Sequence, residues 1–326
     1  DLPLIANTFS WELSAQTGRY GTRFRFVDVF INQDGGDLTP ADRVGVYAFA
    51  EKVTRDDDRI EIERLSEDGT TGGWLLTINR MDPIPVGGFP AENGALAPQF
   101  FHTAGPDRIQ QTLPNFGGMG DDIPRQYNAF LNFDDPNGYR INAVQRATIE
   151  DWFAEFESVF YDDDLWLDPV NGYRKYLNTR DFIDYFHLHN LAKQGDSMLV
   201  SLFPWVSSGE RKLHIGPIWD YNLGAYTSDA TSGVFYRDDR LWFPRLFQDP
   251  DFMREYIDRW YELRRGPFST ANMRNLANAQ AAEFTFGLAV AQGHSVSAWT
   301  AELLGMKDYL ARRAAWIDGQ FFRPPN

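Results

Sequence analysis

Strand-like and helix-like hydrophobic patterns occupy different parts of this chain, and this segregation constrains the fold more than any other sequence feature. Short β-branched and aromatic runs, separated by Gly, Asp and Asn, predict strands at 23–32, 43–53, 60–65 and 72–79. Their short connections indicate an antiparallel meander. Apolar residues at helical spacing dominate the second half. Strands followed by helices favour an α+β fold over an alternating parallel β/α sheet.

The helical patterns begin with residues that cap helices well. Asn142 precedes one apolar stripe, and Asp249 followed by Pro250 precedes another, which ends with basic residues and Gly266. Further helices are predicted over 4–17 and from Thr179, Ser269 and Ser297. We therefore expect a mostly helical C-terminal half.

A β-hairpin interrupts this helical half. Residues 198–206 and 212–215 have strand patterns and are joined by a polar turn at 207–210. We divide the chain into a β-rich region, 1–140, and a helical region, 141–326, which together form one intimate unit. Within the first region, residues 80–140 are rich in Gly, Pro, Asn and Asp, which predicts a long covering or functional loop.

The charge balance limits the partners that suit this chain. Its 31 basic and 46 acidic residues give a formal net charge of −15, which disfavours a broad surface for phosphate backbones. No apolar run approaches the roughly 20 residues that span a bilayer. The chain has no cysteine, which excludes disulfides, thiolate metal sites and cysteine nucleophiles. We expect neither nucleic-acid binding nor a membrane span.

Two isolated carboxylates are the best candidates for chemistry. Asp220 follows an apolar strand exit and precedes Asn222 and Gly224, an arrangement that can present oxygen ligands to a divalent cation. Asp196 lies between a predicted helix and the hairpin, and the hairpin would bring it near Asp220. Two such acids suggest a general base and a metal ligand, although a structural turn is the alternative for Asp220.

Other polar groups give weaker signals. The acidic runs at 56–58 and 162–164 are typical of exposed turns, with loose Ca²⁺ binding as the alternative. His187 and His189 are two apart on a predicted helix and so point to different faces. His214 could line a cleft, although a structural histidine is favoured. The motifs of serine hydrolases, zincins and P-loop proteins are absent from the sequence.

Ten blocks of sequence are spread over most of the length of the chain, from residue 46 to residue 318. They are VYAFAEK at 46–52, DRIEI at 58–62, TGGWLL at 71–76, NGYRKYL at 171–177, DFIDYF at 181–186, KQGD at 193–196, KLHIGPIWDYNL at 212–223, WFPRLFQDP at 242–250, RWYELRRG at 259–266 and RRAAWID at 312–318. With these blocks the chain resembles the larger bacterial branch of the spore-coat CotH kinase family.

The resemblance implies a divergent protein-kinase-like fold in a secreted or cell-surface protein. It also implies ATP-dependent phosphorylation of a protein partner with Mg²⁺ or Mn²⁺. In this family pattern Asp196 takes the place of the catalytic aspartate and Asp220 that of the metal-binding aspartate. Asn222 falls where relatives carry a second acidic or amide residue, so we expect it to be a second metal ligand.

The resemblance also suggests residues for the nucleotide. Ser201 stands five residues after Asp196, where ordinary kinases place an Asn for the second metal. Glu51 and Lys52 fall near the expected nucleotide lobe, with a surface ion pair as the alternative. Leu199 stands where relatives carry Arg. The family's glycine- and serine-containing opening strands would precede residue 1. We expect either that a longer parent protein contains them or that the protein has lost them.

Two other classes of function compete with a kinase. The first is a non-catalytic structural or interaction module that keeps the CotH fold in a cell-surface or extracellular assembly, as part of a polymer or of a larger multidomain parent. The second is a carbohydrate-active protein, which the ten tryptophans and many acids suggest. Because the tryptophans fall on apolar stripes, we expect them in the core instead.

Overall fold

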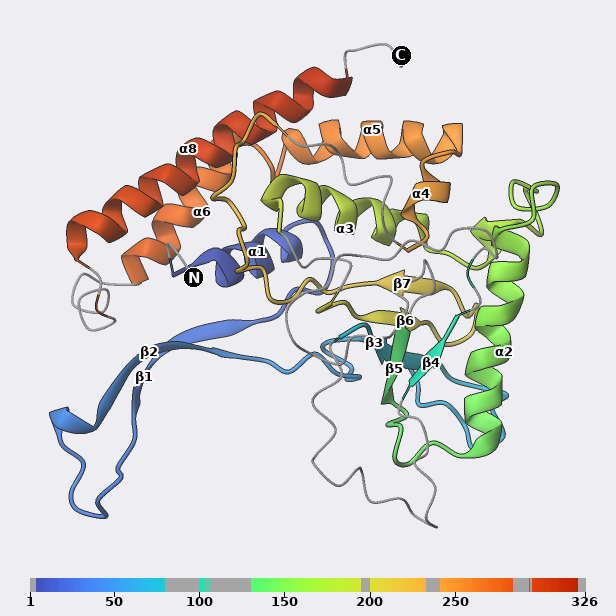
Figure 1. Cartoon of the computed structure of the whole chain (residues 1–326), viewed down its shortest axis with the longest axis horizontal. Coiled ribbons are helices and arrows are strands. Elements are labelled where there is room, and N and C mark those ends of the chain that lie inside the picture. Colours follow the sequence, from blue (N-terminus) through green and yellow to red (C-terminus); the bar gives the residue numbers. More distant parts are fainter. Residues whose placement is uncertain are drawn as a thin grey trace, which may run out of the picture.

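The computed structural model describes residues 4–79, 100–103, 105, 130–194, 200–232, 241–283, 293 and 295–321. A sheet of antiparallel strands lies under a layer of helices, so the fold is α+β, as predicted (Figure 1). None of the helices in these ranges is long and apolar enough to cross a membrane.

Five short strands form the sheet, in the order β4-β5-β3-β6-β7. Their bounds are β3 Trp74–Thr77, β4 Phe100–His102, β5 Phe130–Asp135, β6 Pro204–Val206 and β7 Leu213–Ile215. The predicted hairpin is confirmed as β6 and β7, in which Trp205 pairs with His214. Gly73 precedes β3 at a close approach, since a Cβ there would lie 2.1 Å from the carbonyl oxygen of Val206. The sheet joins strands from both sides of residue 140.

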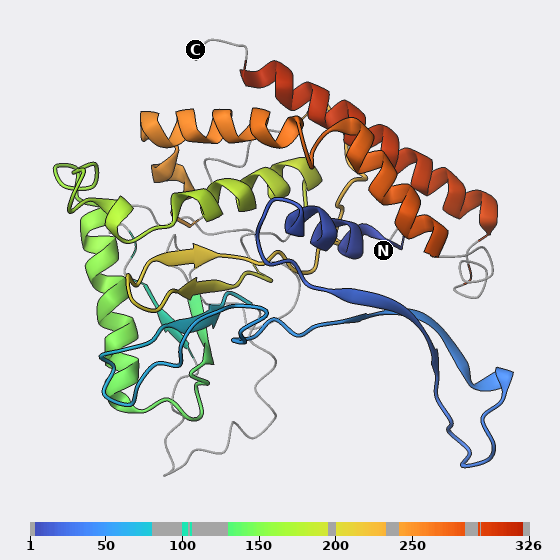
Figure 2. The ribbon, with the colours of Figure 1, turned by 180° about the vertical axis from the view of Figure 1, so that it is seen from behind.

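The predicted meander is wrong. β1 (Phe24–Phe30) and β2 (Arg43–Ala50) pair only with each other, as a two-stranded ribbon that projects from the body of the molecule (Figures 1 and 2). A short 3₁₀ helix, η1 (Pro40–Asp42), lies between them. Residues 60–65 form only isolated bridges.

The pairing of β3 has a physical reason. Trp74, Leu75 and Leu76 are fully buried, a continuous apolar run that suits a strand covered on both faces. β3 therefore lies in the middle of the sheet, between β5 and β6, rather than beside β2.

The long loop predicted at 80–140 contains two of these strands. β5 alternates buried Leu131 and Phe133 with half-buried Asn132 and Asp134, a two-residue period that is too short to stand out from its polar surroundings. β4 has three residues, which is too few for a pattern. The described part of this excursion therefore contains two short strands that the sequence pattern did not predict, and its role as a covering or functional loop stays a prediction.

The predicted helices are found close to their expected positions. The bounds of the helices are α1 Ala6–Ala15, α2 Ala143–Phe160, η3 Tyr173–Lys175, α3 Thr179–Ala192, α4 Phe243–Leu246, α5 Pro250–Arg264, α6 Thr270–Glu283 and α8 Val296–Phe321. The short helices η3 and α4 are additional to the predicted ones. Asn142 caps α2 by accepting a hydrogen bond from the backbone N–H of Gln145 at 2.8 Å. Asp249 caps α5 by accepting one from Asp251 N–H at 2.8 Å.

α3 is the central helix, with twelve of its 14 residues buried. It lies between the sheet and α5, while α6 lies between α1 and α8, and α2 stands at one end of the sheet (Figures 1 and 2). A helix that is buried all round must pair its polar residues internally. Asp184 does so with Arg19 and Arg259, at 3.0 and 2.6 Å. The core is therefore organised around a helix, α3, that buries charged side chains as well as apolar ones.

Candidate functional site

Asp220 lies on the loop that leaves β7, and its backbone is in a conformation that side chains seldom adopt. Its φ angle is 57°, in the left-handed region. Such a conformation costs a non-glycine residue roughly 1–2 kcal/mol, less for Asp because its short side chain can hydrogen-bond locally. The carboxylate is half-buried. A strained, half-buried carboxylate is typical of a functional site, since the surrounding structure must hold it in place.

Three elements hold this loop. The side-chain Nε2 of Gln194 donates to the carbonyl oxygen of Asp220 at 2.8 Å, and Gln194 is almost fully buried just beyond α3. Trp219 stacks on Trp11 of α1, with ring centroids 5.3 Å apart. On the other side, Tyr221 is buried in the core. The ends of α3 and β7 and the face of α1 therefore converge on Asp220.

Asn222 lies two residues further along the same loop and is exposed. Asp220 and Asn222 together offer carboxylate and amide oxygens, the hard ligands that Mg²⁺ and Mn²⁺ prefer. No cluster of three or more His, Asp or Glu side chains suited to a metal occurs among the described residues. A magnesium ion bound with a nucleotide needs only one or two protein carboxylates, because phosphate oxygens and water complete its shell. The two residues fit such an ion.

Asp196 lies outside the described residues, and its role stays a prediction. Gln194, two residues before it, makes the hydrogen bond to Asp220 described above. Ser201, five residues after it, is buried and has a φ angle of 60°. The next residue, Leu202, exchanges backbone hydrogen bonds with Ile78 at 2.8 and 3.1 Å. The structure therefore places Ser201 just before the segment that pairs with β3 and leads into β6.

Two basic residues that sequence reasoning did not assign hold the loop after Asp220. Lys193 donates from Nζ to the carbonyl oxygens of Asp229 and Ser232, at 2.9 and 3.0 Å. Burial, with the nearby Arg313 charge, lowers the pKa of Lys193. Arg313 of α8 is fully buried and donates to the same Ser232 carbonyl at 3.2 Å. The signal for Arg313 was a basic residue on an apolar helix face, between Leu310 and Ile317.

Glu51 and Lys52 follow the end of β2 and do not form an ion pair in the described contacts. Arg23 donates to Glu51 from Nε at 2.8 Å and lies 2.6 Å away through Nη2. The Arg23 hydrogen bond lowers the pKa of Glu51. Burial and the Glu51 charge raise the pKa of Tyr20, which donates to the same carboxylate at 3.2 Å, to about 12. Glu51 thus belongs to a local cluster that ties the base of the ribbon.

Lys52 is exposed and lies close to a different carboxyl group. Burial raises the pKa of Asp134 on β5, and the Lys52 charge opposes that rise. The structure therefore separates the two residues that the sequence grouped, with Glu51 turned to Arg23 and the charge of Lys52 acting on Asp134. Their roles toward a nucleotide stay predictions.

The other residues discussed from sequence have structural settings. His187 stacks on Tyr256 with ring centroids 4.0 Å apart, and burial lowers its pKa to about 3. The acidic runs form turns, in which Asp56 and Asp162 accept backbone N–H bonds. Every tryptophan is buried or half-buried, as expected for core packing.

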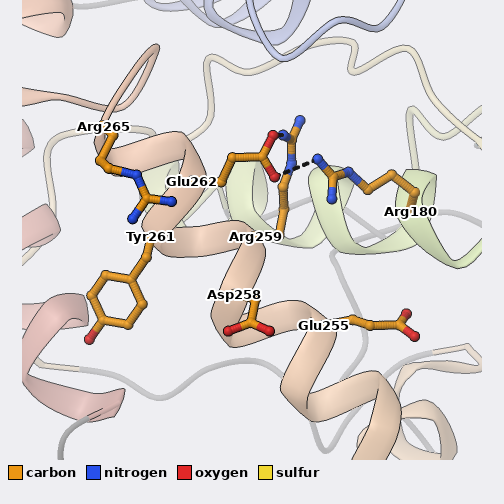
Figure 3. A pocket seen from close by; sticks show the side chains of 7 residues that line it. All are labelled: Arg180, Glu255, Asp258, Arg259, Tyr261, Glu262 and Arg265. Atoms are coloured by element: carbon orange, nitrogen blue, oxygen red, sulfur yellow. Dashed lines mark hydrogen bonds and ion pairs between the residues drawn. The ribbon is translucent and has the colours of Figure 1, made fainter.

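A pocket on the outer face of α5 lies away from the predicted site residues. Its volume is about 570 Å³, and it is lined by Arg180, Glu255, Asp258, Arg259, Tyr261, Glu262 and Arg265. Figure 3 shows the Glu262 carboxylate between the guanidinium groups of Arg259 and Arg180, at 2.5 and 2.7 Å. Because these charges already compensate each other, the pocket does not indicate a catalytic centre.

Comparison with protein-family models identifies a family. A family model described as CotH kinase protein matches residues 136–317, which is more than half of the chain. The matched segment runs from the end of β5 to the last turns of α8 and contains Asp196, Ser201, Asp220 and Asn222. It does not include the ribbon or Glu51 and Lys52. No curated protein matches the chain.

Proposed function

Because the chain belongs to the CotH kinase protein family, we propose that it is a CotH-like kinase that uses ATP with Mg²⁺ or Mn²⁺ to phosphorylate a protein. We further propose that it acts outside the cell or at the cell surface. The observation that carries the catalytic proposal is Asp220, a half-buried carboxylate kept in a left-handed conformation by Gln194 and Trp219.

Asp220 and Asn222 would hold the metal ion, which when bound supplies the positive charge that phosphate oxygens require. The Gln194 hydrogen bond fixes the Asp220 backbone, so that the carboxylate is positioned before the nucleotide arrives. Asp196 would accept the hydrogen bond of the substrate hydroxyl and orient it toward the phosphoryl group. Such positioning, with charge neutralisation, supplies most of the rate in phosphoryl transfer.

A titration of the whole chain with ATP, with and without Mg²⁺ or Mn²⁺, tests this proposal. We expect binding that depends on the metal, and transfer of labelled phosphate that falls about 100-fold or more in Asp220→Ala. The matched control is Asp308→Ala, which removes an exposed carboxylate on α8 and should leave both unchanged. Absence of metal-dependent ATP binding, or undiminished transfer in Asp220→Ala, would overturn the proposal.

A non-catalytic interaction module is the second candidate, and the projecting ribbon favours it. The ribbon and its tip expose Phe49 by 73%, Leu38 by 61% and Tyr47 by 51%. Apolar side chains gathered on a projecting element are typical of contacts with another protein. This candidate would be favoured if the chain binds no nucleotide but forms a stable complex that Phe49→Ser with Tyr47→Ser disrupts.

A further inference from the structure

A second pocket, of about 380 Å³, lies between the β6–β7 hairpin and the first turn of α3. It is lined by Arg174, Leu177, Asn178, Thr179, Ser207, Glu210, Lys212 and His214. None of these residues belongs to the Asp220 site. The pocket lies at the start of α3, whereas Gln194 and Asp220 lie just beyond its end, about 20 Å away for a helix of 14 residues.

His214 is fixed at the wall of this pocket. Its Nδ1 lies 2.5 Å from a carboxylate oxygen of Asp181, and its ring stacks on Trp205 with centroids 3.8 Å apart. Because an ionised carboxylate only accepts hydrogen bonds, we assign the Nδ1 hydrogen to the bond with Asp181. Asp181 is itself buried and paired with Arg19. The contacts with Asp181 and Trp205 therefore fix the orientation of the ring, and Nε2 is the nitrogen that can contact a ligand.

The lining supplies mainly hydrogen-bond donors. Arg174, Lys212 and His214 are cationic or can become so, and hydroxyl and amide groups add further donors. The single carboxylate, Glu210, is 81% exposed, and its 3.7 Å contact with Lys212 is long. Arg174 is already paired with Asp249 and Glu255, so Lys212 and His214 are the groups best suited to a ligand. A donor-rich pocket is unusual in a chain with a net charge of −15.

We propose that this pocket binds a small oxyanion, a phosphate or a carboxylate group, between Lys212 and His214. The Lys212 ammonium supplies charge, and a protonated His214 donates from Nε2 to the oxyanion while its Nδ1–H is bonded to Asp181. The Asp181–His214 pair thus positions a donor toward the pocket. This inference does not depend on the proposed kinase activity, because it uses neither Asp220 nor a nucleotide.

The test follows the NMR signal of the His214 ring. The whole chain, labelled with ¹³C in its histidine rings, is titrated at fixed pH with sodium phosphate and, separately, with sodium acetate, while sodium chloride keeps the ionic strength constant. The His214→Gln variant identifies the signal among the five histidines. We expect a saturable shift of this signal with phosphate, acetate or both, and the two titrations show which oxyanion the pocket prefers.

Lys212→Met should weaken this binding roughly tenfold, since it removes a charged donor. The matched control is Lys307→Met, because Lys307 lies on α8 and bonds to Asn278 of α6, and its loss should leave the titration unchanged. The proposal is overturned if the His214 signal responds to phosphate and acetate no more than to chloride. Equal binding by Lys212→Met and the parent chain would also overturn it.

Discussion

Asp220 is a single residue whose backbone conformation can be tested apart from its chemistry. At a φ angle of 57°, glycine is relieved of the strain that a Cβ imposes, whereas alanine retains it. We predict that Asp220→Gly is more stable than Asp220→Ala by about 1 kcal/mol, as measured by urea denaturation. Both variants should lose metal-dependent ATP binding, because both lack the carboxylate.

Asp308 provides the matched control for this comparison. It is an exposed aspartate within α8, where glycine is less favourable than alanine by about 1 kcal/mol, so the order of stability should be reversed there. If Asp220→Ala proved as stable as Asp220→Gly, the left-handed conformation would not be one that the protein maintains.

His187 makes the stability of the protein depend on pH. Burial lowers its pKa to about 3, well below the ordinary value of about 6.5, and its Nε2 lies 2.9 Å from the Tyr256 carbonyl oxygen. The unfolded chain therefore takes up this proton first as the pH falls. The preference of the folded state for the neutral form of His187 therefore costs no stability above pH 6.5, and it lowers the free energy of unfolding progressively as the pH falls from 6.5 toward 3.

We expect the free energy of unfolding to fall between pH 6.5 and 4, by at most about 1.4 kcal/mol per pH unit from this group. His187→Phe should keep the stacking on Tyr256 and make the dependence shallower. Urea denaturation at several pH values measures both slopes. Identical slopes in the two proteins would show that His187 is not the group responsible.

Arg259 links three helices through its buried guanidinium group. It donates to Asp184 of α3 from Nε at 2.6 Å and to the Thr17 carbonyl beyond α1 at 2.8 Å. We predict that Arg259→Met lowers the free energy of unfolding by about 3–5 kcal/mol, because it removes a partner of a buried carboxylate. Arg254→Met on the same helix removes only an exposed ion pair and should cost no more than about 0.5 kcal/mol.

A double variant separates the loss of a partner from the loss of packing. The combination of Asp184→Leu with Arg259→Met removes the buried carboxylate together with its guanidinium partner. Part of the stability lost in Arg259→Met should therefore return. Thermal and urea denaturation would measure the recovery. A double variant less stable than Arg259→Met alone would contradict this account of the contact between α3 and α5.

The sheet makes the two regions of the chain depend on each other. β6 pairs with β3, which comes from the other side of residue 140, and α1 packs against the helices of the C-terminal half. We predict that a shortened chain beginning at residue 141 does not unfold cooperatively, because β6 and the core would lose the cover of Trp74 and Leu75. Near-ultraviolet circular dichroism during urea denaturation would detect this, with the whole chain as control. A sharp transition in the shortened chain would show that its helical region is an independent domain.

The positions of the helices and the hairpin could be predicted because their signals are local. The caps at Asn142 and Asp249 act on N–H groups two or three residues away, and the hairpin strands face each other across a short turn. Asp220 could be singled out for a similar reason, since it directly follows an apolar strand exit. Its left-handed backbone could not, because nothing in the local sequence requires it.

Sequence by itself therefore determined the α+β class, most helix boundaries and the membership of the CotH family. Tertiary structure decided that β3 pairs with β5 and β6, that β1 and β2 form a separate ribbon, and that Glu51 bonds to Arg23. It also brought Gln194 to Asp220, 26 residues away. The physical reason is the sequence separation over which each signal acts. Hydrophobic periods and caps act within a few residues. The choice among distant partners depends on which arrangement buries Trp74 and Leu75 and pairs the charges, and that is settled only when the whole chain folds.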